Sequence, residues 1–165
     1  MKTVHLIRNE FELRVFGESY PRIDKCLNVL TQNQIWSTPN DVLVPVGCLV
    51  KHLLGNMQQW LYSGVLKEPF IRDRDFEFIA QEELNKKDLL DQMKEAKKRI
   101  IHALDQLTET HLTKNYKIQG FETTGFSAII HVIEHFSYHT GQITTLTKLF
   151  TSQETDYYEE RDLNG

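Results

Sequence analysis

The segment from residue 129 to 143 most constrains the fold, because three histidines recur there at every fourth position in an otherwise apolar run. At 3.6 residues per turn, His131, His135 and His139 fall within an arc of about 80° on a helix. Apolar side chains such as Val132 and Ile143 share this arc, and polar side chains occupy the other side. This face must therefore pack inside the protein. Each buried imidazole then needs a hydrogen-bond partner or a metal ion.

The spacing of the histidines is compatible with metal binding. Two histidines four residues apart on one helical face can chelate a single divalent ion. A third ligand from another helix, with the fourth position open, is the pattern of catalytic zinc sites. The candidates for that third ligand are His5, His52, His102 and His111, and His52 is best placed because it borders the apolar face of its own helix. The alternative is that each histidine is a hydrogen-bonded core or rim residue.

Apolar periodicity predicts an all-α protein built as a four-helix bundle. The expected helices cover about residues 4–30, 46–64, 85–107 and 124–150. Long connections follow the second and third of these helices. Residues 67–78 mix charges and aromatics without a period, and we expect an ordered loop over one end of the bundle. Residues 108–122 are polar and partly β-prone, and we expect an extended arm or a short hairpin.

Several residues mark where these helices begin or change direction. Pro21 falls inside the first helix, so we expect this helix to be kinked or briefly broken near residues 17–21. Asn85, followed three residues later by Asp88, resembles a capping box. Thr123 or Thr124 can cap the fourth helix. The basic run near residue 97 is interspersed with acids, which favours a solvated helix face over a binding patch.

Length and composition indicate a single domain over residues 1–165, with a core of about 2–150 and an acidic tail of 151–165. The tail is expected either to be disordered or to wrap the fold through Tyr157, Tyr158 and Leu163. A net charge of −4 argues against a nucleic-acid partner. No apolar run approaches the ~20 residues that span a membrane, and no secretory signal is visible at the start. Cys26 and Cys48 are expected to be free, buried thiols in a cytoplasmic protein.

The motifs LVKHLLGN (49–56) and HFSYHTGQI (135–143) resemble the DinB-like (YfiT-like) superfamily of metal-dependent proteins. WLYSG (60–64) and RDRDFEF (72–78) resemble one DinB-like subfamily, whose members mostly have no assigned activity. The resemblance covers nearly the whole chain. It implies a four-helix bundle of DinB/YfiT-like connectivity and a homodimer.

The resemblance also implies a metal site. Carried over to this chain, the ligands are His52, His135 and His139, and the ion is a divalent metal, with Zn or Ni favoured. His131 matches no family ligand, so it either supports the site from the cavity wall or competes for the metal. Asn56 and Gln142 lie one turn from ligands. They could orient those ligands or a bound water, although ordinary helix packing explains them equally well.

Relatives with known chemistry use the metal to activate a low-molecular-weight thiol, namely bacillithiol, mycothiol or glutathione, for transfer or isomerisation. The expected function is therefore a metal-dependent transferase acting on such a thiol and a small electrophile. The alternative is a metal-binding, stress-associated or interaction protein without catalytic turnover. A zinc-protease site is not expected, because Glu134 precedes His135 and points away from the histidine arc.

Overall fold

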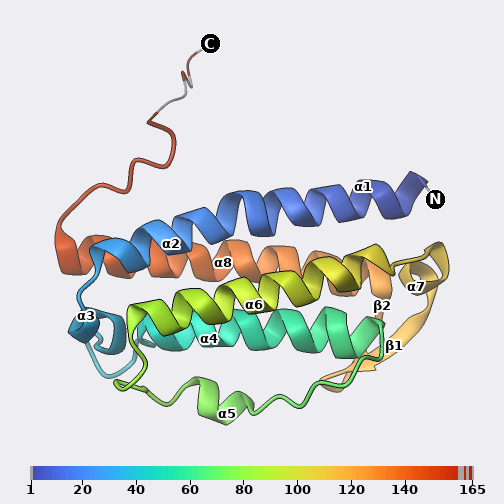
Figure 1. Ribbon diagram of the computed structural model, residues 1–165, viewed down its shortest axis with the longest axis horizontal. Helices are drawn as coiled ribbons and strands as arrows, with labels where there is room; N and C mark the ends of the chain where they lie inside the picture. The colour runs from blue at the N-terminus through green and yellow to red at the C-terminus, as the bar shows by residue number, and fades with distance from the viewer. Residues whose placement is uncertain (1, 160–161, 163, 165) are drawn as a thin grey trace.

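The structure is a computed structural model that describes residues 2–159, 162 and 164. The protein is mostly helical, and its long helices lie side by side (Figure 1). The long helical segments are α1 (Lys2–Phe11), the π-helix η1 (Glu12–Ser19), α2 (Tyr20–Val29), α4 (Val46–Met57), the π-helix η2 (Gln58–Val65), α6 (Lys86–Asp105) and α8 (Gly125–Thr151). The short elements are α3 (Gln32–Trp36), α5 (Arg74–Glu77), α7 (Glu109–Thr113), β1 (Asn115–Ile118) and β2 (Phe121–Thr124).

The first helix is irregular just before Pro21, where a kink or a short break was expected. The chain stays helical from residue 2 to 29, and the region before Pro21 widens into the π-helix η1. The Tyr20 N–H bonds the carbonyl of Val15, five residues back, and the Ser19 hydroxyl donates to the carbonyl of Arg14 at 2.9 Å. The wider turn and this side-chain bond accommodate the proline, which has no N–H to donate.

The predicted helix starts are confirmed. Asn85 caps α6 in a capping box with Asp88, and Thr124 caps α8 by accepting from the Ser127 N–H. The short helix α3 was not expected, and it begins with another capping box at Thr31. These caps satisfy amide groups that have no partner inside the helix.

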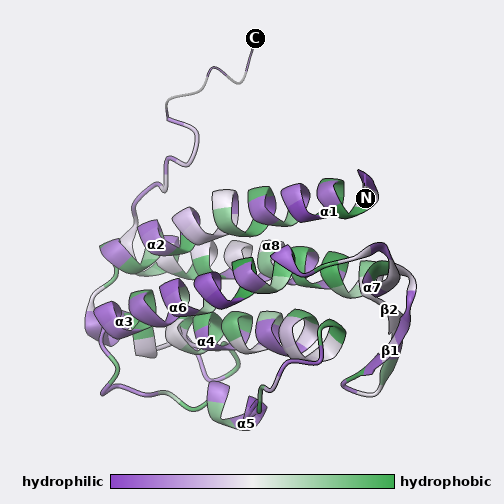
Figure 2. Ribbon diagram, turned by 45° about the vertical axis from the view of Figure 1, so that its right-hand side comes forward, coloured by the Kyte–Doolittle hydropathy of each residue, from purple (hydrophilic) through white to green (hydrophobic). Residues whose placement is uncertain are grey.

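The core lies between the long helices, where the hydrophobic ribbon faces meet (Figure 2). Phe11, Leu53, Leu104 and Phe136 each come from a different helical segment and are at most 1% exposed. Burying one such side chain contributes about 1.5–3 kcal/mol. This apolar packing fixes α4 against α8, and the site described below depends on that pairing.

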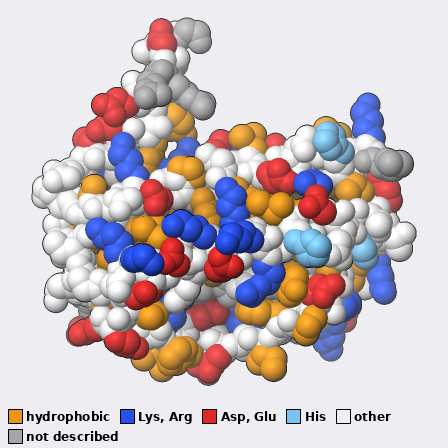
Figure 3. Space-filling view, viewed as in Figure 1, with side chains coloured by type: hydrophobic (Ala, Val, Ile, Leu, Met, Phe, Trp, Pro, Cys, Tyr) orange, Lys and Arg blue, Asp and Glu red, His pale blue; other side chains and the backbone are white. Residues whose placement is uncertain are grey.

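The surface of α6 is a solvated face, as predicted. Lys94 lies 3.3 Å from Asp91, and Lys98 lies 2.6 Å from Glu95. Figure 3 shows basic and acidic side chains interspersed across this side of the molecule. Exposed ion pairs of this kind contribute little to stability.

The connections carry more structure than the sequence suggested. Residues 108–122 contain α7 and most of an antiparallel hairpin, in which Asn115 pairs with Thr124 and Ile118 with Phe121. The loop of residues 67–78 contains the short helix α5, which packs against α4.

The start of the tail contacts the fold. The Tyr157 hydroxyl lies 3.1 Å from the Cys26 sulfur, and the Tyr158 hydroxyl accepts from Arg22 at 2.6 Å. The expected contact through Leu163 lies outside the described residues. Cys26 and Cys48 are free and buried, as expected. Among the helices of the described residues, none combines the length and apolarity needed to cross a membrane.

Candidate metal centre

Three imidazoles from two helices meet inside the bundle. His52 comes from α4, and His135 and His139 come from α8. Each offers one ring nitrogen, and the three nitrogens lie within 4.8 Å of one another. The Nε2 atoms of His52 and His135 are 2.9 Å apart. Because α4 and α8 pack directly together, residues 83 positions apart in the sequence become neighbours.

Two neighbouring side chains fix the tautomers of His52 and His139. The carboxylate Oε2 of Glu77 lies 3.0 Å from Nδ1 of His52, and the amide Oε1 of Gln142 lies 2.6 Å from Nδ1 of His139. A carboxylate and an amide oxygen are acceptors, so Nδ1 carries the proton in both rings. Nε2 of each ring is left with a free lone pair, which is the arrangement that metal-binding histidines require.

Glu77 is held by Arg72. The guanidinium donates to both carboxylate oxygens at 2.6 Å, and a third bond joins its Nη1 to Gln59 Oε1 at 2.8 Å. The Arg72 side chain is 3% exposed and that of Glu77 is 9% exposed. Burial raises the pKa of Glu77, but hydrogen bonds from Arg72 and His52 outweigh it and leave this pKa below its usual value. The carboxylate therefore stays ionised beside His52.

The approach of Glu77 requires a glycine on α4. A Cβ atom at Gly55 would lie 1.9 Å from Oε1 of Glu77 and 2.9 Å from Nε of Arg72. Two further contacts hold α5 in place. Asp73 caps its first turn, and Lys51 of α4 donates to the carbonyl of Phe76 at 2.8 Å. These contacts hold α5 so that its last residue, Glu77, reaches the ring of His52.

His131 lies one turn before His135 and has different partners. Its ring stacks on Trp60 with centroids 3.8 Å apart, and its Nε2 accepts from the Asn56 amide at 3.3 Å. Asn56 is 3% exposed, and its Oδ1 has no hydrogen-bond partner among the described residues. The structure thus places His131 and Asn56 together in a layer beside the triad, with an acceptor left over for a ligand or water.

The environment keeps the imidazoles of α8 neutral. Burial is the main cause that lowers the pKa of His135 to about 3, and the neighbouring His139 and His52 lower it further. Burial also lowers the pKa of His139 and of His131. A neutral imidazole is the form that binds a metal, so these shifts favour coordination over protonation.

The donor set fits a divalent transition metal. Two ring nitrogens at 2.9 Å with lone pairs facing each other would repel, so they share either a proton or a cation. Three neutral imidazoles suit Zn, Ni, Cu or Fe, and three protein ligands leave a position for a further ligand. The charge of Glu77 is offset by Arg72, so a bound cation would keep a net positive charge and attract an anionic ligand.

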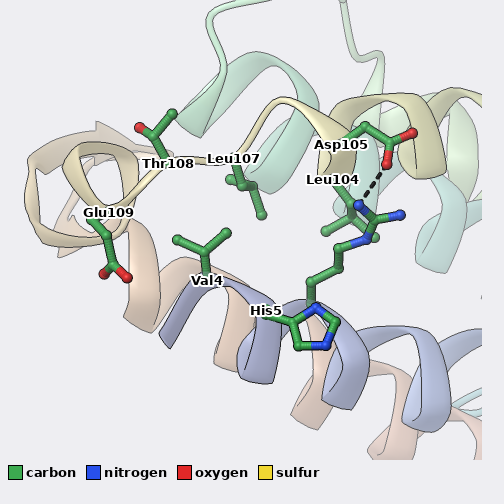
Figure 4. A pocket seen from close by; sticks show the side chains of 8 residues that line it. Val4, His5, Leu104, Asp105, Leu107, Thr108 and Glu109 are labelled. Atoms are coloured by element: carbon green, nitrogen blue, oxygen red, sulfur yellow. Dashed lines mark ion pairs between the residues drawn. The ribbon is translucent and has the colours of Figure 1, made fainter. Parts of the chain in front are cut away.

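The remaining histidines lie elsewhere. His111 belongs to the capping box of α7, and His102 contacts Gln106 at 2.9 Å. His5 lines a separate cavity of about 350 Å³ between α1 and the end of α6. Figure 4 shows this cavity, in which Asp105 pairs with Arg8 at 2.5 Å. None of the triad histidines lines it.

Gln142 and Asn56 lie near the site, as their helical positions suggested, whereas Arg72 and Glu77 were not expected to be parts of it. The two side chains lie in a segment without helical or strand period, so nothing local indicated that they point inward. The only available signal was the RDRDFEF motif, which contains both residues and resembles a DinB-like subfamily.

Comparisons with known proteins agree with this geometry. The model of the family described as "Protein of unknown function (DUF1572)" matches residues 9–158. A DinB-like protein from Bacillus cereus has a similar structure, with a TM-score of 0.67 at 19% identity over 84% of this chain and 89% of the other. A DinB-like protein from Bacillus subtilis gives a TM-score of 0.66 at 15% identity, over 90% and 94%. No curated protein matches the chain.

At these identities the solved structures establish the fold, and the family match covers most of the chain. The protein therefore belongs to the DUF1572 family, whose function is unknown, and it shares its fold with DinB-like proteins.

Proposed function

We propose that this protein binds a divalent metal, Zn²⁺ or Ni²⁺, through His52, His135 and His139, and uses it to activate a low-molecular-weight thiol for transfer to a small electrophile. One observation carries the metal site: three ring nitrogens within 4.8 Å, two of them on rings whose Nδ1 protons are held by Glu77 and Gln142. Both rings are therefore oriented for coordination before any ion arrives, which lowers the cost of binding.

When bound, such a cation would lower the pKa of a coordinated thiol, so that the nucleophilic thiolate would form near neutral pH. The residues of the chain have supporting roles. Arg72 keeps Glu77 ionised, Glu77 and Gln142 hold the Nδ1 protons, and the low pKa of His135 prevents protonation of the site.

The metal site is tested first by metal analysis of protein purified without added metal, followed by titration with Zn²⁺ and Ni²⁺. We expect one ion per chain, with binding abolished by His135→Ala and largely retained by His131→Ala. The second variant is the matched control, since it removes an imidazole from the same helical face. Loss of metal in His131→Ala with retention in His135→Ala would show that the wrong pair was assigned.

The transferase is tested separately on metal-loaded protein. Glutathione, bacillithiol and mycothiol are each assayed with a panel of electrophiles by loss of free thiol. Conjugation that disappears in His135→Ala supports the transferase. A loaded protein that is inactive with all three thiols would instead identify a metal-binding protein without turnover.

A further inference from the structure

A cavity of about 570 Å³ lies against one edge of the histidine triad. Leu49 from α4, Leu146 from α8 and Phe78 after α5 form part of its wall. Its polar lining includes His139, Gln142 and Tyr138. Ligand sites typically have volumes of about 300–1,000 Å³, mostly apolar walls and a few polar groups that converge.

The cavity shares residues with the triad. His139 contributes to both, and Gln142, which holds the Nδ1 proton of His139, also lines the cavity. The Phe78 ring lies 4.9 Å from that of His52. On the opposite side of the triad, His131, Asn56 and Trp60 fill the space. A molecule bound in the cavity would therefore lie beside the proposed metal position.

The lining also limits the charge of a ligand. None of the described residues that line the cavity is Asp, Glu, Lys or Arg. A carboxylate or an ammonium group placed there would lose its hydration without gaining a partner, which is costly. Glutathione and bacillithiol carry carboxylates, so their charged parts do not match this lining. Mycothiol is a polyhydroxylated glycoside, and its many hydroxyl groups do not match a mostly apolar wall.

We infer that the cavity between α4 and α8 binds the electrophilic co-substrate, which is a neutral molecule with an apolar body and one polar group directed at the metal. This inference rests on the proposed metal site. It goes beyond the proposed function because it assigns a chemical class to the acceptor and separates its position from that of the thiol.

Alkyl hydroxamates test this inference, because their head group coordinates zinc and their tail length can be varied. Acetohydroxamate, butanohydroxamate and hexanohydroxamate are titrated into Zn²⁺-loaded protein by calorimetry. Each buried methylene should tighten binding by about fourfold, so at least a tenfold gain from acetohydroxamate to hexanohydroxamate is expected. Adipic monohydroxamate, which ends in a carboxylate, should lose that gain.

Gly141 offers a way to block the cavity. It lines the cavity on α8, and an added Cβ would meet no atom within 4 Å. Gly141→Leu should fill part of the space and remove the dependence on tail length, with Zn²⁺ and acetohydroxamate binding retained. Gly141→Ala adds a smaller side chain, so it should only partly reduce the gain in affinity from acetohydroxamate to hexanohydroxamate.

The outcomes separate this inference from the proposed function. Failure of the wild-type protein to bind Zn²⁺ would overturn both. If the protein binds Zn²⁺ but the loaded protein binds all three hydroxamates with equal affinity, the cavity assignment alone is overturned. A wild-type dimer that Gly141→Leu converts to a monomer, with no effect of tail length, would show that the cavity is a contact between two copies and would also overturn it.

Discussion

Glu77, at the end of α5, connects the segment after η2 to the histidine triad through a hydrogen bond with His52. Its carboxylate accepts from His52 Nδ1 and receives two bonds from Arg72. A histidine ligand whose far nitrogen is held by a carboxylate is a stronger and better oriented donor. Nη2 of Arg72 also lies 3.2 Å from Nδ1 of His52, farther away than Oε2 of Glu77 at 3.0 Å. The pair therefore positions a ligand, and neither residue is proposed to bind the ion.

We predict that Glu77→Ala weakens Zn²⁺ affinity by about 10–100-fold, which is the usual effect of losing such a partner. Isothermal titration of the metal checks this value. Glu134→Ala is the matched control, because Glu134 lies on α8 next to His135 but is exposed and holds none of the triad rings. Equal losses in both variants would mean that overall charge, and not the bond to His52, controls affinity.

A second prediction concerns the stability of the Arg72–Glu77 pair in metal-free protein. Arg72→Met leaves a buried carboxylate without its main partner, and breaking a buried pair in this way costs about 3–5 kcal/mol. The double variant Arg72→Met/Glu77→Leu should recover much of this loss, because no unpaired charge remains. Urea unfolding of the single and double variants measures both effects. Equal stabilities would show that Glu77 is protonated or solvated in the single variant.

At the scale of elements, the site depends on close packing between α4 and α5. Gly55 leaves the space that Glu77 occupies, and η2 presents Gln59 to Arg72 and Trp60 to His131. A π-helix places side chains at angles that a regular α-helix does not reach, and such segments often occur at functional sites.

We predict opposite effects for two glycine-to-alanine changes in helices. Gly55→Ala should lower the melting temperature and weaken Zn²⁺ binding, because the new Cβ collides with a carboxylate held by three hydrogen bonds. Gly141→Ala should stabilise the protein by about 0.5–1 kcal/mol, because alanine is the better helix former and its Cβ meets open space. Thermal unfolding compares the two. Stabilisation by Gly55→Ala would mean that α5 can move away from α4 at little cost.

For the whole molecule, proton and metal binding are linked to folding. His135 has a pKa of about 3 in the folded chain and an ordinary pKa near 6.5 when unfolded. Protonation therefore favours the unfolded chain. The contribution of His135 to stability is fully present above about pH 6.5 and is lost as the pH falls toward 3.

We predict that the metal-free protein becomes steadily less stable between pH 6.5 and pH 4. The lowered pKa values of His139 and His131 add to the effect in the same direction. Urea unfolding at several pH values in the presence of a chelator measures the slope. His135→Gln should reduce that slope, and an unchanged slope in this variant would show that other groups are responsible.

We also predict that removing the metal lowers stability at pH 7. An ion that binds only the folded chain stabilises it by about 2.7 kcal/mol at a hundredfold excess over its Kd. Adding a chelator to the loaded protein should therefore lower the melting temperature, and replenishing Zn²⁺ should restore it. The same treatment should leave the melting temperature of His135→Ala unchanged. An equal chelator effect in this variant would place the ion elsewhere.

Most of the helical framework could be predicted from local sequence. The capping residues Asn85 and Thr124 were correctly identified, because a cap bonds amides only two or three residues away. An irregularity near Pro21 could be expected because proline has no N–H to donate, but its form as a π-helix depends on shifted backbone bonds over a whole turn. The short helices α3, α5 and α7 were missed, since each is too short to show a period.

The sequence by itself determined that His131, His135 and His139 share one buried face, because the four-residue spacing fixes their angles on any α-helix. The apolar face of residues 46–64 made His52 the best-placed partner among the other histidines, and the family resemblance assigned it as a ligand. Only the tertiary structure decided that Glu77 and Arg72 support His52, that His131 stacks on Trp60, and that an uncharged cavity adjoins the triad. These contacts join α4 and α8 to segments with no local period, and the packing that creates them leaves no trace in residue spacing.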